Sequence, residues 1–545
     1  MSKTIVVKGG LVADGTGGEL YEADVAIKDG RIAAIGQGLN GDEELDARGQ
    51  IVAPGFIDMH THYDAQLFWD PDCTPSSWQG VTSVVIGNCG FALAPCRPEN
   101  RETLVQMLVE LEDMPAKVLN AGIQWSFTDF AGYMASVEAL RPTLNIAAYV
   151  GHSPVRVDVM GADAYDRAAT DEEIARMAAI VGQAMDAGAI GFASSSAPTG
   201  RRSATGKADA RELLALGKAM AKDGRGVMAM VPGGQHLSRE AMYDMQADIG
   251  RPFTWTALMQ TADGGHRASA ALHAERYAKG ARVHPQVSCR PIVSMTTLRT
   301  AFAMRAASML ALEGKSDAER IAAFRDPAWR ATVKTELANY AFTISWDRWT
   351  ISESPTSPEL EGMTIEALAK RLGVDGLDAA IDLALADGLA TRFTVVQVNY
   401  EEDEVAKLLR IDGAVLGLAD SGAHPDQICD AILPTDLLGK WVRDKKVLPI
   451  ETAVRKLTGE LADLFGLDRG YLKIAAPADI TVFDPATIGP GPVRRVYDQP
   501  AGGERLIADR ATGLTHMLVN GVPIRRDGAA LARGAAGGPG RMLRG

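Results

Sequence analysis

The chain has 545 residues, of which 46% are hydrophobic and 23% charged, and its formal net charge is −13. This composition is globular and excludes overall disorder, while the acidic balance argues against nucleic acid or an anionic membrane as a partner. No apolar run reaches the ~18 residues that cross a bilayer, and five cysteines in a chain of this length argue against a disulfide framework, so we expect a cytoplasmic protein with reduced thiols.

Short β-like runs occupy both ends of the chain. They are apolar, they are bounded by Gly and Asp turn signals, and they lie at residues 5–7, 25–27, 32–35, 478–484 and 517–521. The two ends therefore predict a small β-sandwich domain formed by residues 1–53 and 473–545. We expect the last ~15 residues, which are rich in Gly and Arg, to be mobile.

The middle of the chain alternates strand-like with helical patterns. Its apolar strand-like runs are residues 51–62, 81–88, 144–152, 189–195, 226–232, 253–260, 282–288 and 415–420. Helical patterns such as residues 171–187 and 208–222 lie between them. Eight such units predict an α/β fold, a TIM-like (β/α)8 barrel over residues 54–472. Helical segments and an extra strand-like run, 393–398, predict an insertion around residues 290–400.

The strongest local pattern is PGFIDMHTH at residues 54–62, where an apolar strand ends in His-x-His. Side chains two apart on a strand share a face, so His60 and His62 can point into the barrel mouth and bind one divalent cation. Functional residues of such barrels sit at the C-terminal ends of the strands. This position favours a metal site over two ordinary polar residues.

A second apolar strand ends in GLADSGAH, at residues 417–424. Asp420 can ligate a metal and accept a proton from a water molecule whose pKa the metal lowers to around 7. An isolated Asp at a strand end is more often a turn or cap residue. His424 either assists in substrate binding or lies in a surface loop.

These segments, together with GNCGFALAP at residues 87–95 and ADITVFD at residues 478–484, resemble the amidohydrolase superfamily and its D-aminoacylase (N-acyl-D-amino-acid deacylase) branch. The resemblance covers nearly the whole chain. It implies a barrel joined to a small β-sandwich, and hydrolysis of an amide with one or two zinc ions. It also implies that His60 and His62 are ligands, that Cys89 is a metal-binding thiolate, and that Asp420 is the catalytic base. Without the resemblance, a lone Cys is more often a small buried hydrophobe.

The sequence departs from the family where the fifth and sixth strands usually supply one histidine each. Neither of the corresponding runs contains His. The metal set therefore either shrinks to His60, His62, Cys89 and Asp420, which is a tetrahedral set, or gains ligands from loops. His236 and His266 follow those two runs and are the candidate replacement ligands.

The arginine that the family places shortly after the catalytic Asp is also absent. Arg290, after the seventh run, either supplies the bidentate fork that a substrate carboxylate needs or forms a structural ion pair. His152 and His284 end or lie in strand-like runs, and each can bind substrate or a metal.

We therefore expect a zinc-dependent amidohydrolase that cleaves an N-acyl (D-)amino acid or a related small-molecule amide. A hydrolase of a cyclic amide or another C–N bond on the same scaffold is the nearer alternative. The alternative of another class is a metal-free binding or assembly protein, which only the missing histidines support. A homo-oligomer is compatible with each of these functions.

Overall fold

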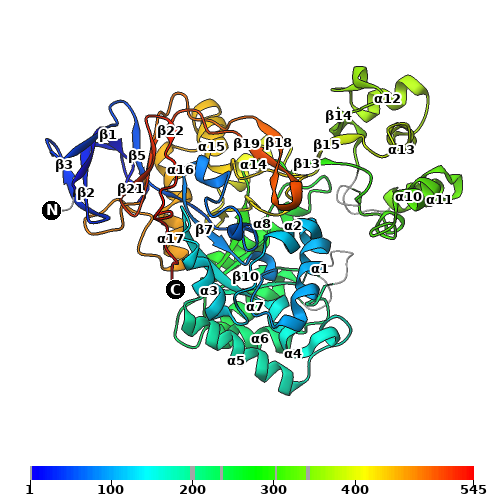
Figure 1. The fold of residues 1–545 in the computed structure, drawn as a ribbon, viewed down its shortest axis with the longest axis horizontal. Helices are drawn as coiled ribbons and strands as arrows, with labels where there is room; N and C mark the ends of the chain where they lie inside the picture. The colour runs from blue at the N-terminus through cyan, green and yellow to red at the C-terminus, as the bar shows by residue number, and fades with distance from the viewer. Residues whose placement is uncertain (1–2, 197–202, 234–236, 301–303, 339–343) are drawn as a thin grey trace.

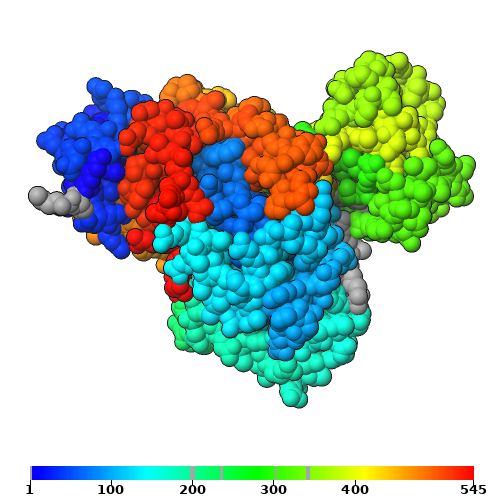
Figure 2. Space-filling view, in the orientation of Figure 1, coloured from blue at the N-terminus to red at the C-terminus, as the bar shows by residue number. Residues whose placement is uncertain are grey.

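The computed structural model describes residues 3–196, 203–233, 237–300, 304–338 and 344–545. A central barrel carries, on one side, a sheet built from both ends of the chain, and on the other side a lobe that stands away from the main body (Figures 1 and 2). Within the described residues, no helix combines the length and the apolarity that crossing a bilayer requires.

Eight parallel strands form the barrel, in the order β16-β12-β11-β10-β9-β8-β7-β6. Their bounds are β6 (Phe56–Asp58), β7 (Val81–Ile86), β8 (Asn145–Gly151), β9 (Gly191–Ser195), β10 (Val227–Val231), β11 (Phe253–Trp255), β12 (Val283–Val287) and β16 (Val415–Leu416). A parallel bridge between Thr61 and Ser421, which follow β6 and β16, joins the two ends of this sheet. The predicted barrel is thus confirmed, with every strand inside its predicted run.

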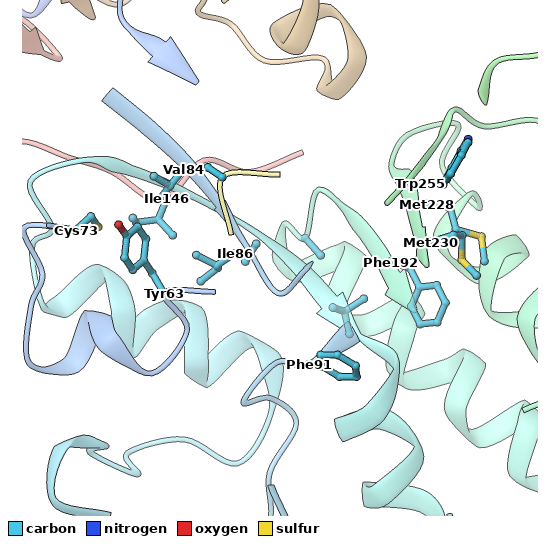
Figure 3. Close-up of a cluster of buried hydrophobic side chains, with 14 of the residues drawn as sticks. Tyr63, Cys73, Val84, Ile86, Phe91, Ile146, Phe192, Met228, Met230 and Trp255 are labelled. Atoms are coloured by element: carbon cyan, nitrogen blue, oxygen red, sulfur yellow. The ribbon is translucent and has the colours of Figure 1, made fainter. Parts of the chain in front are cut away.

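The strands are buried on both faces, as parallel barrel strands must be. In β10, Val227 and Ala229 belong to the core inside the barrel, while Met228 and Met230 belong to the core between the strands and the helices. Figure 3 shows both methionines in the outer core near Trp255 of β11. Continuous apolar runs, rather than alternation, follow from this double burial.

Helices cover the outside of the barrel and fill the connections between strands. They are α1 (Arg101–Glu112), α2 (Ala116–Gly122), α3 (Phe130–Ala139), α4 (His152–Met160), α5 (Asp171–Ala187), α6 (Ala210–Met220), α7 (Arg239–Ile249), α8 (Gly265–Ala278), α14 (Glu402–Leu408), α15 (Leu433–Asp436), α16 (Ile450–Leu457) and α17 (Gly459–Phe465). Helix α5 matches its predicted range because both ends are encoded locally. Thr170 and Glu173 form a capping box at its start, and Gly188 ends it in the left-handed conformation.

Both ends of the chain build one sheet, in the order β22-β21-β20-β17-β5-β1-β2-β3, with β4 beside β1. The bounds are β1 (Ile5–Val12), β2 (Tyr21–Lys28), β3 (Arg31–Gly36), β4 (Glu43–Asp46), β5 (Ile51–Pro54), β17 (Ile480–Phe483), β20 (Leu514–Val519), β21 (Val522–Arg526) and β22 (Ala529–Ala530). Val7, Val52 and Val482 share one core, so the two ends fold together. The boundaries at residues 53 and 473 stay predictions. A separate hairpin consists of β18 (Val493–Gln499) and β19 (Gly503–Ala508).

The lobe lies in the stretch around residues 290–400, for which the insertion stays a prediction. It holds the antiparallel sheet β13 (Val293–Thr296), β15 (Arg392–Val396) and β14 (Trp349–Glu353), and the helices α9 (Ala307–Leu310), α10 (Asp317–Arg325), α11 (Pro327–Ala338), α12 (Ile365–Leu372) and α13 (Gly376–Ala386). Trp349, Ile381 and Phe393 lie in its own hydrophobic core. The backbone N–H of Met295 donates to the carbonyl of Gln427 at 2.7 Å, which ties the lobe to the loop that follows β16.

The prediction of a mobile C-terminal segment is wrong. The carbonyl of Arg541 accepts a hydrogen bond from the N–H of Ile146 at 2.9 Å, and the N–H of Leu543 donates to the carbonyl of Ile146 at 2.7 Å. Met542 and Leu543 are each only 7% exposed. Leu543 joins the core inside the barrel, together with Phe465 of α17. The prediction rested on the Gly-rich composition of the segment and did not take into account that Met542 and Leu543 can be buried.

We expect Leu543→Ala to lower the free energy of unfolding by about 2–3 kcal/mol, because it removes a buried side chain and leaves a cavity. Urea unfolding followed by circular dichroism measures the loss. Leu531→Ala is the matched control, since Leu531 belongs to the same C-terminal segment but is 43% exposed. Equal stability of the two variants would show that the segment does not contribute to the core in solution.

Candidate metal centre

Three neighbouring barrel strands deliver polar side chains to the same end of the barrel. His60 and His62 follow β6, Cys89 follows β7, and Asp420 follows β16. Because β6 pairs with β7 and the segments after β6 and β16 are bridged, residues that lie far apart in the sequence become neighbours. All four come from the carboxyl ends of their strands, where barrel enzymes carry their chemistry.

The donor atoms of these side chains lie in contact. His60 Nε2 lies 3.1 Å from Asp420 Oδ1 and 3.5 Å from Cys89 Sγ, and His62 Nε2 lies 3.3 Å from Asp420 Oδ1. His60, His62 and Cys89 form the one group, within the described part of the chain, whose donor atoms all lie within 4.8 Å of one another. Asp420 is not a member of this group of three, but its Oδ1 contacts both imidazoles.

This geometry fits a zinc ion. Zinc lies about 2.0–2.1 Å from imidazole nitrogen and about 2.3 Å from thiolate sulfur, so tetrahedral ligand atoms are separated by about 3.3–3.6 Å. The contacts of 3.1–3.5 Å among the donor atoms approach those separations. Three protein ligands plus a fourth open position is the usual arrangement of a catalytic zinc site.

The charges of the group are coupled. Burial alone would lower the pKa of His60, but Cys89 and Asp420 raise it to about 10. Burial would raise the pKa of Cys89, yet the two imidazoles lower it below its usual value. Burial opposes the charge of Asp420 as well, but hydrogen bonds from His60 and His62 hold the pKa of this carboxyl well below its usual range. The thiolate and the carboxylate are thus favoured, as metal binding requires.

The backbone is bent sharply where these side chains emerge. Cys89 has φ 57° and Asp420 has φ 50°, both in the left-handed region that non-glycine residues rarely adopt. Gly90, next to Cys89, also has positive φ, and a Cβ there would lie 2.7 Å from the carbonyl of Ala193. The Gly-Asn-Cys-Gly sequence therefore lets the loop after β7 pass close to β9 and turn the thiol toward the histidines. Strain of this kind concentrates at functional sites.

The side chain of Asp420 is more exposed to solvent than those of the two histidines. The side chains of His60 and His62 are only 1% and 3% exposed, whereas that of Asp420 is 23% exposed. Asp420 is therefore more accessible to an entering molecule than either imidazole.

Four polar residues around the histidines were not predicted from the sequence as site residues. Gln286 and Thr256 contact His60 Nδ1, Glu112 Oε1 lies 3.7 Å from His62 Nδ1, and Asp58 accepts a hydrogen bond from the N–H of His60 at 3.2 Å. Burial raises the pKa of Asp58 to about 7. Gln286 lies two residues after His284, on the same face of the strand-like run 282–288, and this alternation of polar residues was the available signal.

Two predicted substrate residues are engaged away from the centre. His152 is fully buried, with Nδ1 2.8 Å from Ser194 Oγ and Nε2 2.7 Å from Glu212. Glu212 also pairs with Arg156, so His152 belongs to a buried charge network. His284, near the start of β12, has its Nδ1 2.9 Å from the carbonyl of Gly413. The structure supports neither as a member of the metal group.

Arg290 forms the ion pair that the sequence left open as an alternative. Its Nε donates to Asp430 at 2.9 Å, and a terminal nitrogen lies 3.6 Å from Asp436. His424 lies beside the centre: its Nδ1 is 2.8 Å from Asp113, and its N–H donates to the carbonyl of Glu112 at 2.8 Å.

The structure does not place His266 among the ligands. His266 lies on α8, where its Nδ1 accepts a hydrogen bond from the N–H of Thr261 at 3.2 Å and its Nε2 lies 3.1 Å from Glu404 of α14. Both ring nitrogens therefore already have partners. His236 lies outside the described residues.

Known proteins are similar to this chain in sequence and in fold. The model of the Amidohydrolase family matches residues 43–499. N-acyl-D-glutamate deacylase of Alcaligenes xylosoxydans xylosoxydans is 30% identical over 560 aligned residues, covering 99% of this chain and 96% of that protein. N-acyl-D-glutamate deacylase from Bordetella bronchiseptica, solved with zinc and a phosphonate mimic of the tetrahedral intermediate, is 27% identical, with a TM-score of 0.69 and 100% of both chains covered. A solved D-aminoacylase with a binuclear metal centre, described by one-metal activation and second-metal attenuation, is 26% identical, with a TM-score of 0.69 over 99% of both chains.

Proposed function

The chain belongs to the amidohydrolase family, and we propose that it is a zinc-dependent enzyme that hydrolyses the amide bond of an N-acyl (D-)amino acid or a related small amide. The resemblance to this family that the sequence motifs indicate is thereby confirmed. The observation that carries the proposal is the convergence of two imidazoles, a thiol and a carboxylate at the carboxyl ends of three adjacent strands.

Each residue has a distinct task. His60, His62 and Cys89 would hold the zinc, and Asp420 lies against both imidazoles. Zinc, when bound, supplies Lewis-acid polarisation of the amide carbonyl and lowers the pKa of the attacking water. Asp420 takes the proton of that water and delivers it to the leaving nitrogen, so that the amine departs uncharged. Its exposure of 23% lets this carboxylate reach the substrate.

His424 is the remaining candidate for substrate binding near the centre. Asp113 holds its Nδ1, and Glu112, whose carbonyl holds its backbone, faces His62. The C-terminal end of α1 thus connects a metal-ligand candidate to the loop that follows Asp420. We assign His424 to contacts with the substrate beside the scissile amide.

We expect one zinc ion per chain, because the described residues offer one group of donors. Elemental analysis after zinc saturation and desalting measures this count. His236→Ala is the informative variant, since His236 is the predicted replacement ligand that the structure does not describe, and we expect its zinc count to be unchanged. Two ions in the native chain, falling to one in this variant, would contradict the single-ion site.

A substrate panel decides between the two amide classes. Arg290 is bound to Asp430 and Asp436 in the structure, which favours testing substrates without a carboxylate alongside those with one. N-acetyl-D- and N-acetyl-L-amino acids are compared with cyclic imides, and we expect turnover of the D-amino acid derivatives to exceed that of the cyclic imides. Preference for the imides would make the cyclic amide the substrate class.

The cellular setting is also a proposal. All five cysteines are free thiols, which supports the proposal that the protein functions in the reducing cytoplasm. Homo-oligomerisation stays a prediction, which size-exclusion chromatography with light scattering tests.

A further inference from the structure

The Nδ1 of His60 has partners from two strands that lie beyond β16 in the barrel, β12 and β11. Gln286, on β12, is 1% exposed, and its Oε1 lies 2.8 Å from His60 Nδ1. Thr256, directly after β11, places Oγ1 3.3 Å from the same nitrogen. These side chains come from the sixth and seventh strands, so they hold the ring from behind while its Nε2 faces Cys89 and Asp420.

The barrel leaves a space for this contact at one glycine. Gly417 follows β16, the strand that separates β12 from β6. A Cβ at this position would lie 2.8 Å from Oε1 and 3.2 Å from the amide carbon of Gln286. A separation under 3 Å forces an atom to move, so any larger residue here would push the amide out of its place. The absence of a side chain at Gly417 is therefore what lets Gln286 reach across β16 to His60.

The contact selects one of the two neutral forms of the imidazole. An amide oxygen only accepts hydrogen bonds, so Oε1 requires the proton of His60 on Nδ1. In the neutral ring, the form that binds a metal, Nε2 then carries the lone pair, and this is the nitrogen that lies between Cys89 Sγ and Asp420 Oδ1. Ligating histidines in proteins are commonly fixed in this way by a partner on the other ring nitrogen.

A neutral acceptor also suits the charges around this ring. Asp58 and Asp420 both act on His60, and Cys89 adds a third acidic group. An amide orients the imidazole without adding a further negative charge at a fully buried position. Thr256 contacts the same nitrogen. The sixth strand, on which the family usually carries a histidine, thus supports His60 in this chain.

We propose that Gln286 is a positioning residue that fixes the Nε2-ligating form of His60, and that Gly417 is required because it makes room for the Gln286 amide. The inference rests on the proposed function, since it takes His60 to be a zinc ligand. It assigns no contact with the substrate to Gln286.

Zinc affinity, measured by competition with a chromophoric chelator on the full-length chain, tests this role without reference to activity. We expect Gln286→Leu to weaken zinc binding by about 10- to 100-fold. Gln286→Glu retains an acceptor oxygen for Nδ1, so it should bind zinc more tightly than Gln286→Leu does. Gly417→Ala displaces the amide and should resemble Gln286→Leu, which keeps the test informative if one variant folds poorly.

Thr254→Val is the matched control. Thr254 is a fully buried residue of β11 whose hydroxyl has no hydrogen-bond partner among the described residues. This change therefore removes a buried polar atom from the same region of the barrel without touching His60. We expect its zinc affinity to be native. Native affinity in both Gln286→Leu and Gly417→Ala would overturn the inference, as would equal weakening in Thr254→Val. Failure of the proposed function has a different signature, namely a native chain that binds no zinc or that binds zinc and hydrolyses no amide.

Discussion

Replacing Asp420 with Asn is expected to reduce amide hydrolysis by at least about 10³-fold while zinc stays mostly in place. The amide of Asn retains an oxygen that can face His60 and His62, but it cannot accept the proton of the attacking water. Asp420 is not needed to form the group of three donors, His60, His62 and Cys89, whose atoms lie within 4.8 Å of one another. Turnover and zinc content are therefore measured on the same preparation, and they are expected to separate.

Asp426→Asn is the control for this prediction. Asp426 lies on the same loop but outside the metal group, so Asp426→Asn removes a carboxylate from this loop without changing a metal-ligand candidate. We expect turnover of this variant to stay near native. A near-native rate in Asp420→Asn would remove Asp420 from the proton transfer, and loss of zinc together with activity would make it mainly a ligand.

Cys89→Ala is expected to lower zinc affinity by at least about tenfold, because a lost ligand costs no less than the 10- to 100-fold typical of an outer partner. Hydrolysis at limiting zinc should fall in parallel. The thiol is the only sulfur donor of the described group, and the left-handed backbone at Cys89 turns it toward His60. Metal titration and activity at stated free zinc measure the two effects.

Cys96→Ala is the matched variant for the thiol. Cys96 is fully buried near the same loop, its Sγ contacts the carbonyl of Arg97 at 3.5 Å, and burial raises its pKa to about 12. It therefore has the properties of a structural thiol, and its replacement should leave the zinc affinity unchanged. Unchanged zinc affinity in Cys89→Ala would instead assign Cys89 to the core.

The barrel was predictable because its signals are local. Each strand is a short apolar run bounded by Gly, Pro or polar residues, and double burial makes such runs continuous. The ends of α5 are encoded by Thr170, Glu173 and Gly188, which cap the helix without help from distant residues. The C-terminal segment was mispredicted, because burial of Met542 and Leu543 depends on the open end of a barrel that composition does not reveal.

The fold class, the family and the residues that could carry metal chemistry were predictable from short segments, because residue type and strand-end position are local properties. Which of these candidates meet depends on how distant strands pack together. The structure gathered His60, His62, Cys89 and Asp420, and it paired Arg290 with carboxylates and His152 with Glu212. It also revealed Gln286, whose role depends on space left by Gly417 on another strand. Contacts of a few ångströms between distant segments arise from barrel closure, which no local pattern encodes.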